Sequence, residues 1–404
     1  MEQSLKNISI IGTGPVGLIS AIALSKMTDF EITIFGPKLS NDILEKDTRT
    51  TAFMAPSIQL LDKCGIWKNC NQNASPLKHL RMIDDCGSLI RAPECYFSAQ
   101  ELDMPFFAQN IPNSDLNKAL IEMILDENKI TWVETKAVTN IENKTEEVLI
   151  TTQEQKKYST DYCIGADGRN SICRQATSIK TNKWDYDQTA IACAFTHSAP
   201  HKATSTEIHR TTGPMTLIPL EEYRSSLVWS LTPKEASRIT ALNDDEFSSL
   251  LFENSHAIIG EITSVEPRKA FPITGLKLDK FAENRIALVG EAAHVIPPIG
   301  AQGMNLGLRD AAHLVDILKE TSSNKAQISN ITDEYNNSRK TDIFSRTFVI
   351  DMLNKSLLLN NISLRSIRSA GLTILRNFKS MRQMIMQQGL GDEMSLPSLM
   401  KKEA

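Results

Sequence analysis

Apolar and polar positions near the start of the chain predict a strand, a helix and a second strand. The apolar run "ISII" (8–11) leads through a glycine-rich turn into "PVGLISAIALSK" (15–26), and "EITIF" follows at 31–35. The short apolar runs have the length of buried strands, whereas the segment between them has the length of a helix. This order is typical of the first unit of an α/β fold.

A second strand-and-helix unit is predicted near the end of the chain, whereas the middle of the chain shows a different pattern. Near the end, "RIALV" (285–289) predicts a buried strand and "LGLRDAAHLVDIL" (306–318) predicts a helix. The middle of the chain differs, because its apolar positions alternate with polar ones, which predicts an antiparallel sheet. We expect these strands at 189–197, 204–211, 215–220 and 224–231, with helices near 233–253.

The first turn carries three glycines at the spacing G-x-G-x-x-G, namely Gly12, Gly14 and Gly17. The first permits a tight turn, the second lets the backbone approach a pyrophosphate, and the third lets the helix pack closely. Pro15 suits the first turn of that helix, whose N-terminus favours phosphate. We interpret this turn as a dinucleotide-binding loop; a tight turn without a ligand is the alternative. Gly36 stands where an acidic residue usually binds the ribose, so the ribose must be held otherwise.

A second glycine turn, "GADGRNS" (165–171), follows another apolar strand and contains Asp167 and Gly168. A plain Asp-Gly turn is the alternative interpretation. The third stretch, "GEAAHVIPPIGAQGMNLG" (290–307), has four glycines, two prolines and almost no charge. A core loop of this kind would leave backbone N–H and C=O groups unpaired. We therefore expect its backbone to lie against a ligand.

Length, charge and cysteine usage exclude several classes of protein. The chain has 404 residues, which predicts more than one domain, and a net charge of −4, which gives no nucleic-acid signature. Its seven cysteines form no close pair, so we expect no metal site, no disulfide framework and a reducing cytoplasm. The start lacks the apolar region of a signal peptide, and no apolar run approaches the roughly 18 residues of a membrane span.

The ordered motifs, together with "DTRTTAF" (47–53), resemble those of class A flavoprotein aromatic hydroxylases. Within that class the chain is most similar to ubiquinone-biosynthesis hydroxylases, which act on polyprenyl phenols. "GPMTLIPL" (213–220) and "VIDMLNKSLL" (349–358) extend the resemblance over most of the chain. It implies an α/β fold, with a Rossmann-like FAD-binding domain, an antiparallel-sheet substrate domain and a C-terminal helical tail. The implied boundaries are 1–72, 98–178 and 280–345 for the discontinuous FAD-binding domain, 73–97 and 179–279 for the substrate domain, and 346–404 for the tail.

The resemblance also assigns roles to single residues. Glu291 reaches a ribityl or ribose oxygen, although the family usually has aspartate there. Pro297 and Pro298 line the flavin, and Gly303 with its two successors offers N–H groups to the flavin pyrimidine edge. Pro298 and Gly303 are the expected catalytic positions, because the Pro298 carbonyl lies near the reacting substrate. The expected FAD-binding residues are Gly12, Gly14, Pro15, Val16, Gly17, Arg49, Asn113, Asp167, Gly168, Gly290, Glu291, Pro297, Gly300, Gly303, Met304 and Asn305.

Some of these residues have simpler interpretations. Arg49 matches a family arginine near the FAD phosphates or ribityl chain, but an ion pair with Asp47 is the alternative. Asn113 contacts the cofactor in the family, but it could instead cap a helix at 114–127. His294 is expected to be an ordered structural histidine rather than a catalytic base. By resemblance three residues belong to the substrate-domain strands and are candidates to border the pocket: Glu207, Arg210 and Trp229. Sheet surface or core is the alternative for each, and none is assigned as catalytic.

The implied reaction is hydroxylation of the aromatic ring of a polyprenyl phenol by O₂. In such enzymes FAD, reduced by NAD(P)H or a ferredoxin-type donor, forms a C4a-hydroperoxide that transfers its distal oxygen to the ring. The phenol hydroxyl activates the ring, and the apolar "VIPPIGAQGM" wall (295–304) excludes water. Two alternatives stay open: a class A hydroxylase of a soluble aromatic compound, and a non-catalytic flavoprotein scaffold in a biosynthetic complex.

The tail is basic and apolar. From Phe344 to Gln388 the only acid is Asp351, and the bases are Arg346, Lys355, Arg365, Arg368, Arg376, Lys379 and Arg382. A basic amphipathic helix can lie on an anionic membrane. A helix packed on its own domain, or on a partner in a ubiquinone-biosynthesis complex, is the alternative. We expect a cytoplasmic protein, with peripheral attachment to the inner face of the membrane left open.

Overall fold

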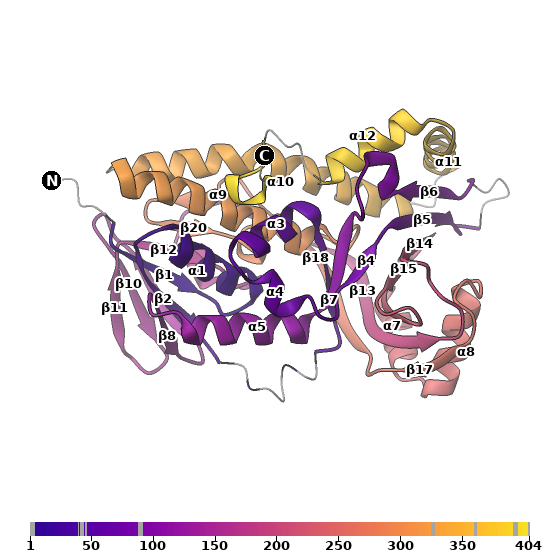
Figure 1. Ribbon diagram of the computed structural model, residues 1–404, viewed down its shortest axis with the longest axis horizontal. Coiled ribbons are helices and arrows are strands. Elements are labelled where there is room, and N and C mark those ends of the chain that lie inside the picture. Colours follow the sequence, from indigo (N-terminus) through magenta and orange to yellow (C-terminus); the bar gives the residue numbers. More distant parts are fainter. Residues whose placement is uncertain are drawn as a thin grey trace.

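Two large sheets lie side by side along the long axis of the molecule (Figure 1). The computed structural model describes residues 5–38, 40, 44, 47–87, 92–324, 328–358, 362–390 and 395–402, without the side chains of 322–324 and 362–369. The two basic residues Arg365 and Arg368 of the tail are therefore outside the described side chains. The sheet on the left of Figure 1 is mostly parallel, and the sheet on the right is mostly antiparallel.

The parallel sheet has the strand order β19-β20-β12-β1-β2-β8, in which only β19 runs antiparallel to its neighbour. Its strands are near-continuous apolar runs because both faces are covered. Helices pack on one face, and the small sheet formed by residues 138–160 packs on the other, where Phe35 meets Tyr158. Ile8 and Ile10 of the first strand, for example, are fully buried. The strands are β1 (Asn7–Ile11), β2 (Glu31–Gly36), β8 (Ile130–Glu134), β12 (Tyr162–Gly165), β19 (Ala282–Glu283) and β20 (Ile286–Leu288).

Helices from distant parts of the chain pack together beside this sheet. Helix α1 (Pro15–Met27) packs between the sheet and α9 (Gln302–Asn324), so most of its residues are buried. Helix α5 (Asn113–Asp126) packs beside α1, and α10 (Ile328–Leu358) packs along α9. The first and last thirds of the chain therefore share one core.

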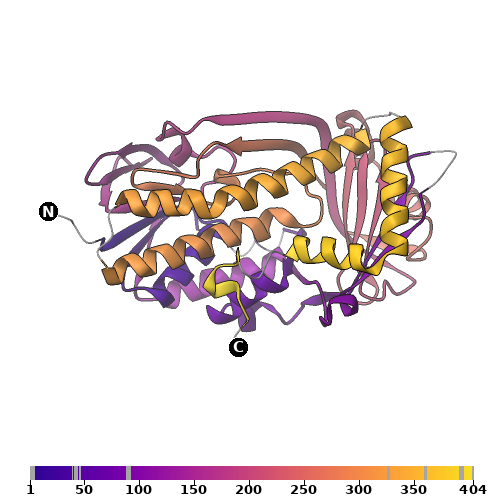
Figure 2. The same ribbon diagram turned by 90° about the horizontal axis from the view of Figure 1, so that it is seen from above.

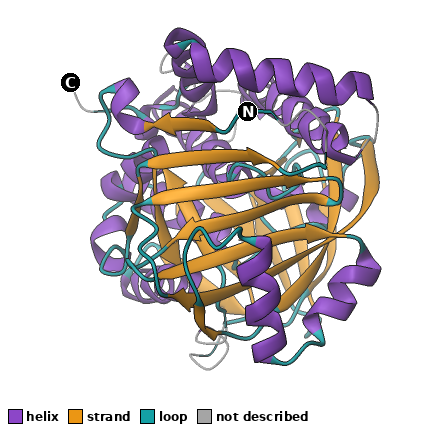
Figure 3. Ribbon diagram, turned by 90° about the vertical axis from the view of Figure 1, so that its right-hand side faces the viewer, coloured by secondary structure: helices purple, strands orange, loops and turns teal. Residues whose placement is uncertain are grey.

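The second sheet has eight strands in the order β17-β13-β16-β15-β14-β5-β6, with β18 paired to β13. Figure 3 shows it from the right-hand side of the molecule. Its outer face packs on α7 (Pro233–Thr240) and α8 (Asp244–Asn254) through an apolar cluster that includes Trp229 and Phe247. The strands are β5 (His79–Asp84), β6 (Cys95–Ser98), β13 (Thr181–His197), β14 (Thr204–Arg210), β15 (Gly213–Pro219), β16 (Arg224–Leu231), β17 (Ile262–Val265) and β18 (Lys269–Leu278).

Two three-stranded sheets complete the β structure. One, in the order β3-β7-β4, connects the two large sheets, and the other, in the order β11-β10-β9, lies at the left end of Figure 1. Their strands are β3 (Thr50–Met54), β4 (Ser75–Leu77), β7 (Ala108–Pro112), β9 (Val138–Asn143), β10 (Val148–Thr152) and β11 (Lys157–Thr160). The short helices are α3 (Ala55–Lys63), α4 (Trp67–Cys70), α6 (Ile172–Gln175), η1 (Ala99–Leu102), η2 (Gly290–Ala292) and η4 (Ser398–Met400).

The long helix α10 runs without a break through residue 345, where we expected the boundary between the FAD-binding domain and the tail. Helix α10 starts over the parallel sheet and reaches the antiparallel one (Figure 2). Helices α11 (Ile362–Asn377) and α12 (Lys379–Leu390) then turn back along the same face. None of the helices in the described part of the chain is long and apolar enough to cross a membrane.

Candidate functional site

The three glycine turns predicted from the sequence meet at one edge of the parallel sheet. They follow the adjacent strands β1, β12 and β20, which run parallel to one another. Ligands of open α/β sheets bind at this carboxyl edge. The fold therefore brings together three segments that are more than 100 residues apart in the sequence.

Close packing requires the glycines at three of these positions. A Cβ on Gly12 would stand 2.3 Å from the Ala166 carbonyl oxygen, and one on Gly17 would stand 2.2 Å from the Gly12 carbonyl oxygen. A Cβ on Gly290 would come within 3.3 Å of Val16, so the first and third turns also touch. The backbones of the three turns therefore lie too close together to leave room for side chains at these positions.

Other glycines at the same edge face open space. A Cβ on Gly14, Gly168 or Gly303 would meet no atom within 4 Å. Helix α1 begins directly after Gly14, with no side-chain cap and no acid in its first turn. Its first amides are therefore available to an anion, and the helix N-terminus favours negative charge. A dinucleotide pyrophosphate fits this arrangement.

The structure explains why position 36 is glycine and not the acid that usually binds the ribose. Gly36 ends β2, and a Cβ there would stand 2.8 Å from two side-chain atoms of Thr13. The Thr13 hydroxyl donates a hydrogen bond to the Pro37 carbonyl at 2.9 Å. Thr13 thus occupies the space that an acidic side chain on residue 36 would need.

Two ion pairs border the glycine edge. Arg169 donates to Glu291 through Nε and Nη2, both at 3.0 Å, and so joins the second turn to the third. Arg49 donates to Asp47 through Nε and Nη2, both at 2.7 Å, and lies 5.5 Å from the centre of the Phe271 ring. The Asp47 alternative for Arg49 is thus observed. Each arginine is already paired with a carboxylate. The N–H groups at the start of α1 are therefore the main source of positive electrostatic potential for a bound phosphate.

Asn113 does not cap its helix, so the capping interpretation was wrong. The N-cap of α5 is Pro112, which has no side-chain cap hydrogen bond. The Asn113 carbonyl oxygen instead accepts from the Thr51 hydroxyl at 2.7 Å, and its amide donates to Asp47 at 3.5 Å. Asn113 therefore belongs to the Arg49 cluster, where a cofactor contact was expected.

Asp167 lies at the edge, but its carboxylate faces its own helix. It accepts from the Ser171 hydroxyl at 2.6 Å and from two amides at the start of α6. Arg174, which is 5% exposed, donates to the carbonyls of Arg169 and Ala292 at 2.7 and 2.8 Å. Burial lowers the pKa of Arg174. This buried arginine, whose role the sequence did not predict, ties the second turn to the third.

The apolar loop before α9 is exposed where the resemblance places the flavin. Pro297 is buried, but Pro298, Gly300 and Gly303 are exposed. Ala301 has a left-handed φ of +53°, which is unfavourable for a residue with a Cβ. Asn305 fixes the loop, because its side chain accepts from the Met54 N–H at 2.9 Å and donates to the Ala52 and Ala301 carbonyls.

A buried charge network supports the loop from below. Asp310 of α9 is fully buried and accepts from the Gly290 N–H at 3.0 Å, from His294 Nε2 at 2.6 Å and from Arg339 at 2.7 Å. Burial alone raises the pKa of Asp310, but these partners outweigh it and hold the pKa below its usual value. His294 is 2% exposed, as a structural histidine would be. Nearby, burial and Arg339 lower the pKa of His313 to about 4.

The antiparallel sheet presents a polar pair on its inner face. Ile208 packs with α8 on the outer face, so its neighbours Glu207 and His209 face inward. They are 5% and 1% exposed, and His209 Nε2 lies 2.6 Å from Glu207 Oε1. His209 Nδ1 has no hydrogen-bond partner among the described residues. On the same inner face Phe271 pairs with Ala190, so this face extends from the Arg49 cluster to His209.

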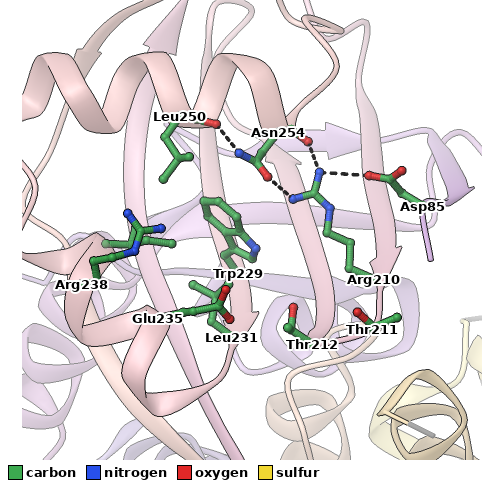
Figure 4. Close-up of a pocket in the computed structure, with 11 residues that line it drawn as sticks. Asp85, Arg210, Thr211, Thr212, Trp229, Leu231, Glu235, Arg238, Leu250 and Asn254 are labelled. Carbon is green, nitrogen blue, oxygen red and sulfur yellow. Dashed lines mark hydrogen bonds and ion pairs between the residues drawn. The ribbon is translucent and has the colours of Figure 1, made fainter. Parts of the chain in front are cut away.

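Arg210 and Trp229 lie on the opposite face and do not border the flavin side. They line a separate cavity of about 300 Å³ between the sheet and the helices α7 and α8. Figure 4 shows Arg210 held by Asp85 and Asn254, with the Trp229 ring beside it. Burial lowers the pKa of Arg210, although Asp85 opposes this effect. Arg210 and Trp229 thus lie on the face of the sheet that packs on α7 and α8, whereas Glu207 faces inward.

No group of three or more histidine, cysteine or acidic side chains that could hold a metal ion occurs within the described residues. All seven cysteines are buried, and none is in a disulfide among the described residues. Burial raises the pKa of Cys64 and Cys70 to about 12, so these thiols are weak nucleophiles.

Comparisons with known proteins agree with this geometry. The family model described as "FAD binding domain" matches residues 6–343. The chain is 25% identical to the 3-demethoxyubiquinol 3-hydroxylase of Escherichia coli (strain K12), over 97% of this chain and 100% of that protein. It is 27% identical to the ubiquinone hydroxylase UbiL of Rhodospirillum rubrum, over 78% and 73% of the two chains.

The fold is similar to that of p-nitrophenol 4-monooxygenase PnpA from Pseudomonas putida DLL-E4. The TM-score is 0.75 at 16% identity, over 96% of this chain and 99% of that one. This likeness confirms the expected fold class. The family match and the curated relatives confirm FAD as the cofactor and the resemblance that the motifs indicated.

Proposed function

The chain belongs to the FAD-binding domain family, and on that premise we propose that it hydroxylates the aromatic ring of a polyprenyl phenol in ubiquinone biosynthesis. The observation that carries the proposal is the meeting of three glycine turns and one exposed apolar loop at the carboxyl edge of the parallel sheet. Relatives named for ubiquinone hydroxylation, similar over most of their length, supply the substrate class.

The residues of the glycine edge are proposed to hold FAD as follows. The α1 amides beyond Gly14 bind the pyrophosphate, and the Arg49 and Glu291 clusters contact the ribityl chain or ribose. The backbone of 297–305 lines the flavin ring, where Gly303 leaves room for close approach. We also propose the division into an FAD-binding part, a substrate part at 73–97 and 179–279, and a helical tail.

The chemistry that FAD supplies when bound is the two-electron reduction of O₂, with one oxygen entering the ring and the other leaving as water. The net reaction consumes one phenol ring, one O₂ and two electrons, which come from one NAD(P)H with one proton or from two reduced ferredoxins with two protons, and it yields the hydroxylated ring and one water. The chain's own contribution is to exclude water: Pro298 presents apolar surface, Pro297 and Ile299 are buried beside it, and the two prolines have no N–H donor. The Asn305 and Asp310 contacts hold this wall in place.

The polar pair of the inner face is proposed to orient the substrate. His209 Nδ1 lacks a partner, although it is buried. A buried polar atom without a partner is costly unless a ligand satisfies it. We assign it to the ring hydroxyl of the phenol, with Glu207 fixing the tautomer of His209 through Nε2. This contact would also favour loss of the phenol proton, which makes the ring more electron-rich.

The direct test is turnover under ¹⁸O₂. Purified protein loaded with FAD is given a short-chain prenyl phenol in detergent, with NAD(P)H or reduced ferredoxin. We expect one ¹⁸O atom in the ring product. Reductant consumption without any ring product would contradict the proposal, and product formed only from soluble aromatic acids would favour a class A hydroxylase of a different substrate.

A further inference from the structure

Exposed apolar side chains concentrate on the last three long helices. Of the eleven exposed large hydrophobic residues in the described part of the chain, eight lie between residues 348 and 385. They include Phe348 and Val349 of α10, which are 63% and 61% exposed, and Phe378 between α11 and α12, which is 57% exposed. The others are Met352, Ile374, Met381, Met384 and Ile385. Clustering of this kind marks an interaction site, whereas single exposed apolar residues do not.

Packing within the chain does not explain these positions. Each helix already buries one face: Met386 of α12 and Leu372 of α11 pack with Cys95 and Phe97 of β6. On α12 the exposed residues Met381, Met384 and Ile385 follow the i, i+3, i+4 spacing of a separate helical stripe. The outward stripe is therefore a second apolar face that nothing in the described chain covers.

The charge of the same segment is complementary to an anionic surface. Residues 348–390 contain six basic side chains and one acid, Asp351, which pairs with Lys355 at 2.8 Å, although the whole chain has a net charge of −4. The stretch from 374 to 385 contains bases and no acid. Arg376 and Lys379 are exposed, beside Ile374 and Phe378. Arg382 is already paired with Glu101 at 3.0 Å, so it does not contribute to this surface. Apolar side chains flanked by bases without acids match the interface of a bilayer with anionic lipids.

The three helices lie on one face of the molecule. Figure 2 shows the end of α10, then α11, then α12 on three sides of a frame over the antiparallel sheet. The buried side of α10 contacts the inner face of that sheet, where Asn354 donates to Gln188 at 2.9 Å. One set of helices therefore has an outward apolar face and an inward contact with the proposed substrate face.

We propose that the outward side chains of residues 348–352 and 374–385 dock the protein on an anionic lipid bilayer. The helices lie in the interface rather than span it, in agreement with the absence of a spanning helix in the described chain. The reason for lipid as the occupant rests in part on the proposed function, because a polyprenyl phenol resides in membrane. Docking would bring the inner face of the sheet next to the layer from which the substrate comes.

The test is sedimentation of full-length, FAD-loaded protein with vesicles of phosphatidylcholine alone and with roughly a third of phosphatidylglycerol. We expect binding to the anionic vesicles that weakens as salt rises. The apolar variant, Phe348→Ser with Phe378→Ser, and the charge variant, Arg376→Glu with Lys379→Glu, are each expected to lower the partition coefficient at least about tenfold. The matched controls are Leu125→Ser and Lys118→Glu on α5, on the lower side of the molecule in Figure 1, and they should bind as the wild type does.

Two results would overturn the inference. One is equal binding of the surface variants and the wild type, or no binding of either. The other is a lipid-independent dimer that the Phe348 and Phe378 changes dissociate, which would make a second copy the occupant. The vesicles contain no phenol, so failure of the proposed reaction would leave binding intact. Conversely, the surface variants should hydroxylate a detergent-soluble phenol at the wild-type rate, which also shows that they are folded.

Discussion

Arg169 and Glu291 form a two-point ion pair, with both N–O distances at 3.0 Å, that links the turn after β12 to the turn after β20. The two side chains are about half exposed. An exposed pair of this kind contributes little to folding stability. Its value lies in its position, because it sets the direction of the one acidic side chain in the third glycine turn.

Glu291 is one methylene longer than the aspartate usual in the resembled family. The role of this extra length can be tested by replacing Glu291 with aspartate. Glu291→Asp should lose the two-point contact with Arg169, and Glu291→Gln should lose the charge. We expect the free energy of unfolding to change by less than about 1 kcal/mol. FAD affinity, measured by fluorescence titration, should fall several-fold in both variants. An affinity equal to that of the wild type in both would remove Glu291 from the cofactor site.

A substitution at Gly14 tests ligand binding separately from packing of the fold. Its φ of −76° is open to any residue, and no atom would contact its Cβ. Gly14→Val should therefore leave the melting temperature of the cofactor-free protein nearly unchanged, but it should raise the Kd for FAD at least about tenfold by filling the pyrophosphate path. Gly17→Val is the contrast, because its Cβ would stand 2.2 Å from a carbonyl oxygen and should destabilise the fold itself. Unimpaired FAD binding by Gly14→Val would place the cofactor elsewhere.

His209 should matter for turnover and not for FAD binding. His209→Gln is expected to lower kcat/KM about 10- to 100-fold, in the range of a lost acid–base or orienting group. The rate should also lose part of its pH dependence, which a merely structural role would not cause. Glu207→Gln should have a smaller effect in the same direction, and His256→Gln, at an exposed position, serves as the control. Unchanged kinetics in His209→Gln would exclude the substrate contact.

The lowered pKa of His313 predicts how folding stability changes in acid. Burial and Arg339 lower its pKa to about 4, against an ordinary value of 6.5. The unfolded chain therefore takes up the proton first, and folding stability falls as the pH decreases from 6.5 to about 4, then no further from this group. The loss is at most about 3 kcal/mol. His313→Leu should flatten this part of the stability curve in urea titrations, and an unchanged slope would contradict the assignment.

Local sequence signals predicted the elements well, and long-range contacts explain most of what they missed. Gly12, Gly14 and Gly17 lie within one turn, so their spacing alone indicates the loop. Asn113 was misread as a possible cap because its partners, Asp47 and Thr51, are more than 60 residues away in the sequence.

The inner and outer faces of the antiparallel sheet were also hidden from the sequence. Arg210 and Glu207 lie three residues apart on β14, and the sequence does not show which of them faces the parallel sheet. Packing of Ile208 against α8 decides it. Gly36 likewise looked like a missing acid until Thr13, 23 residues earlier, was seen to occupy its space.

The most direct test of the central claim is mass spectrometry of the quinone lipids in a strain that lacks this protein and has no second ring hydroxylase of the same specificity. The proposed function predicts loss of ubiquinone and accumulation of a polyprenyl phenol that lacks one ring oxygen, with recovery when the wild-type gene, but not the Gly14→Val variant, is returned. Unchanged ubiquinone in that strain would contradict a role in its biosynthesis.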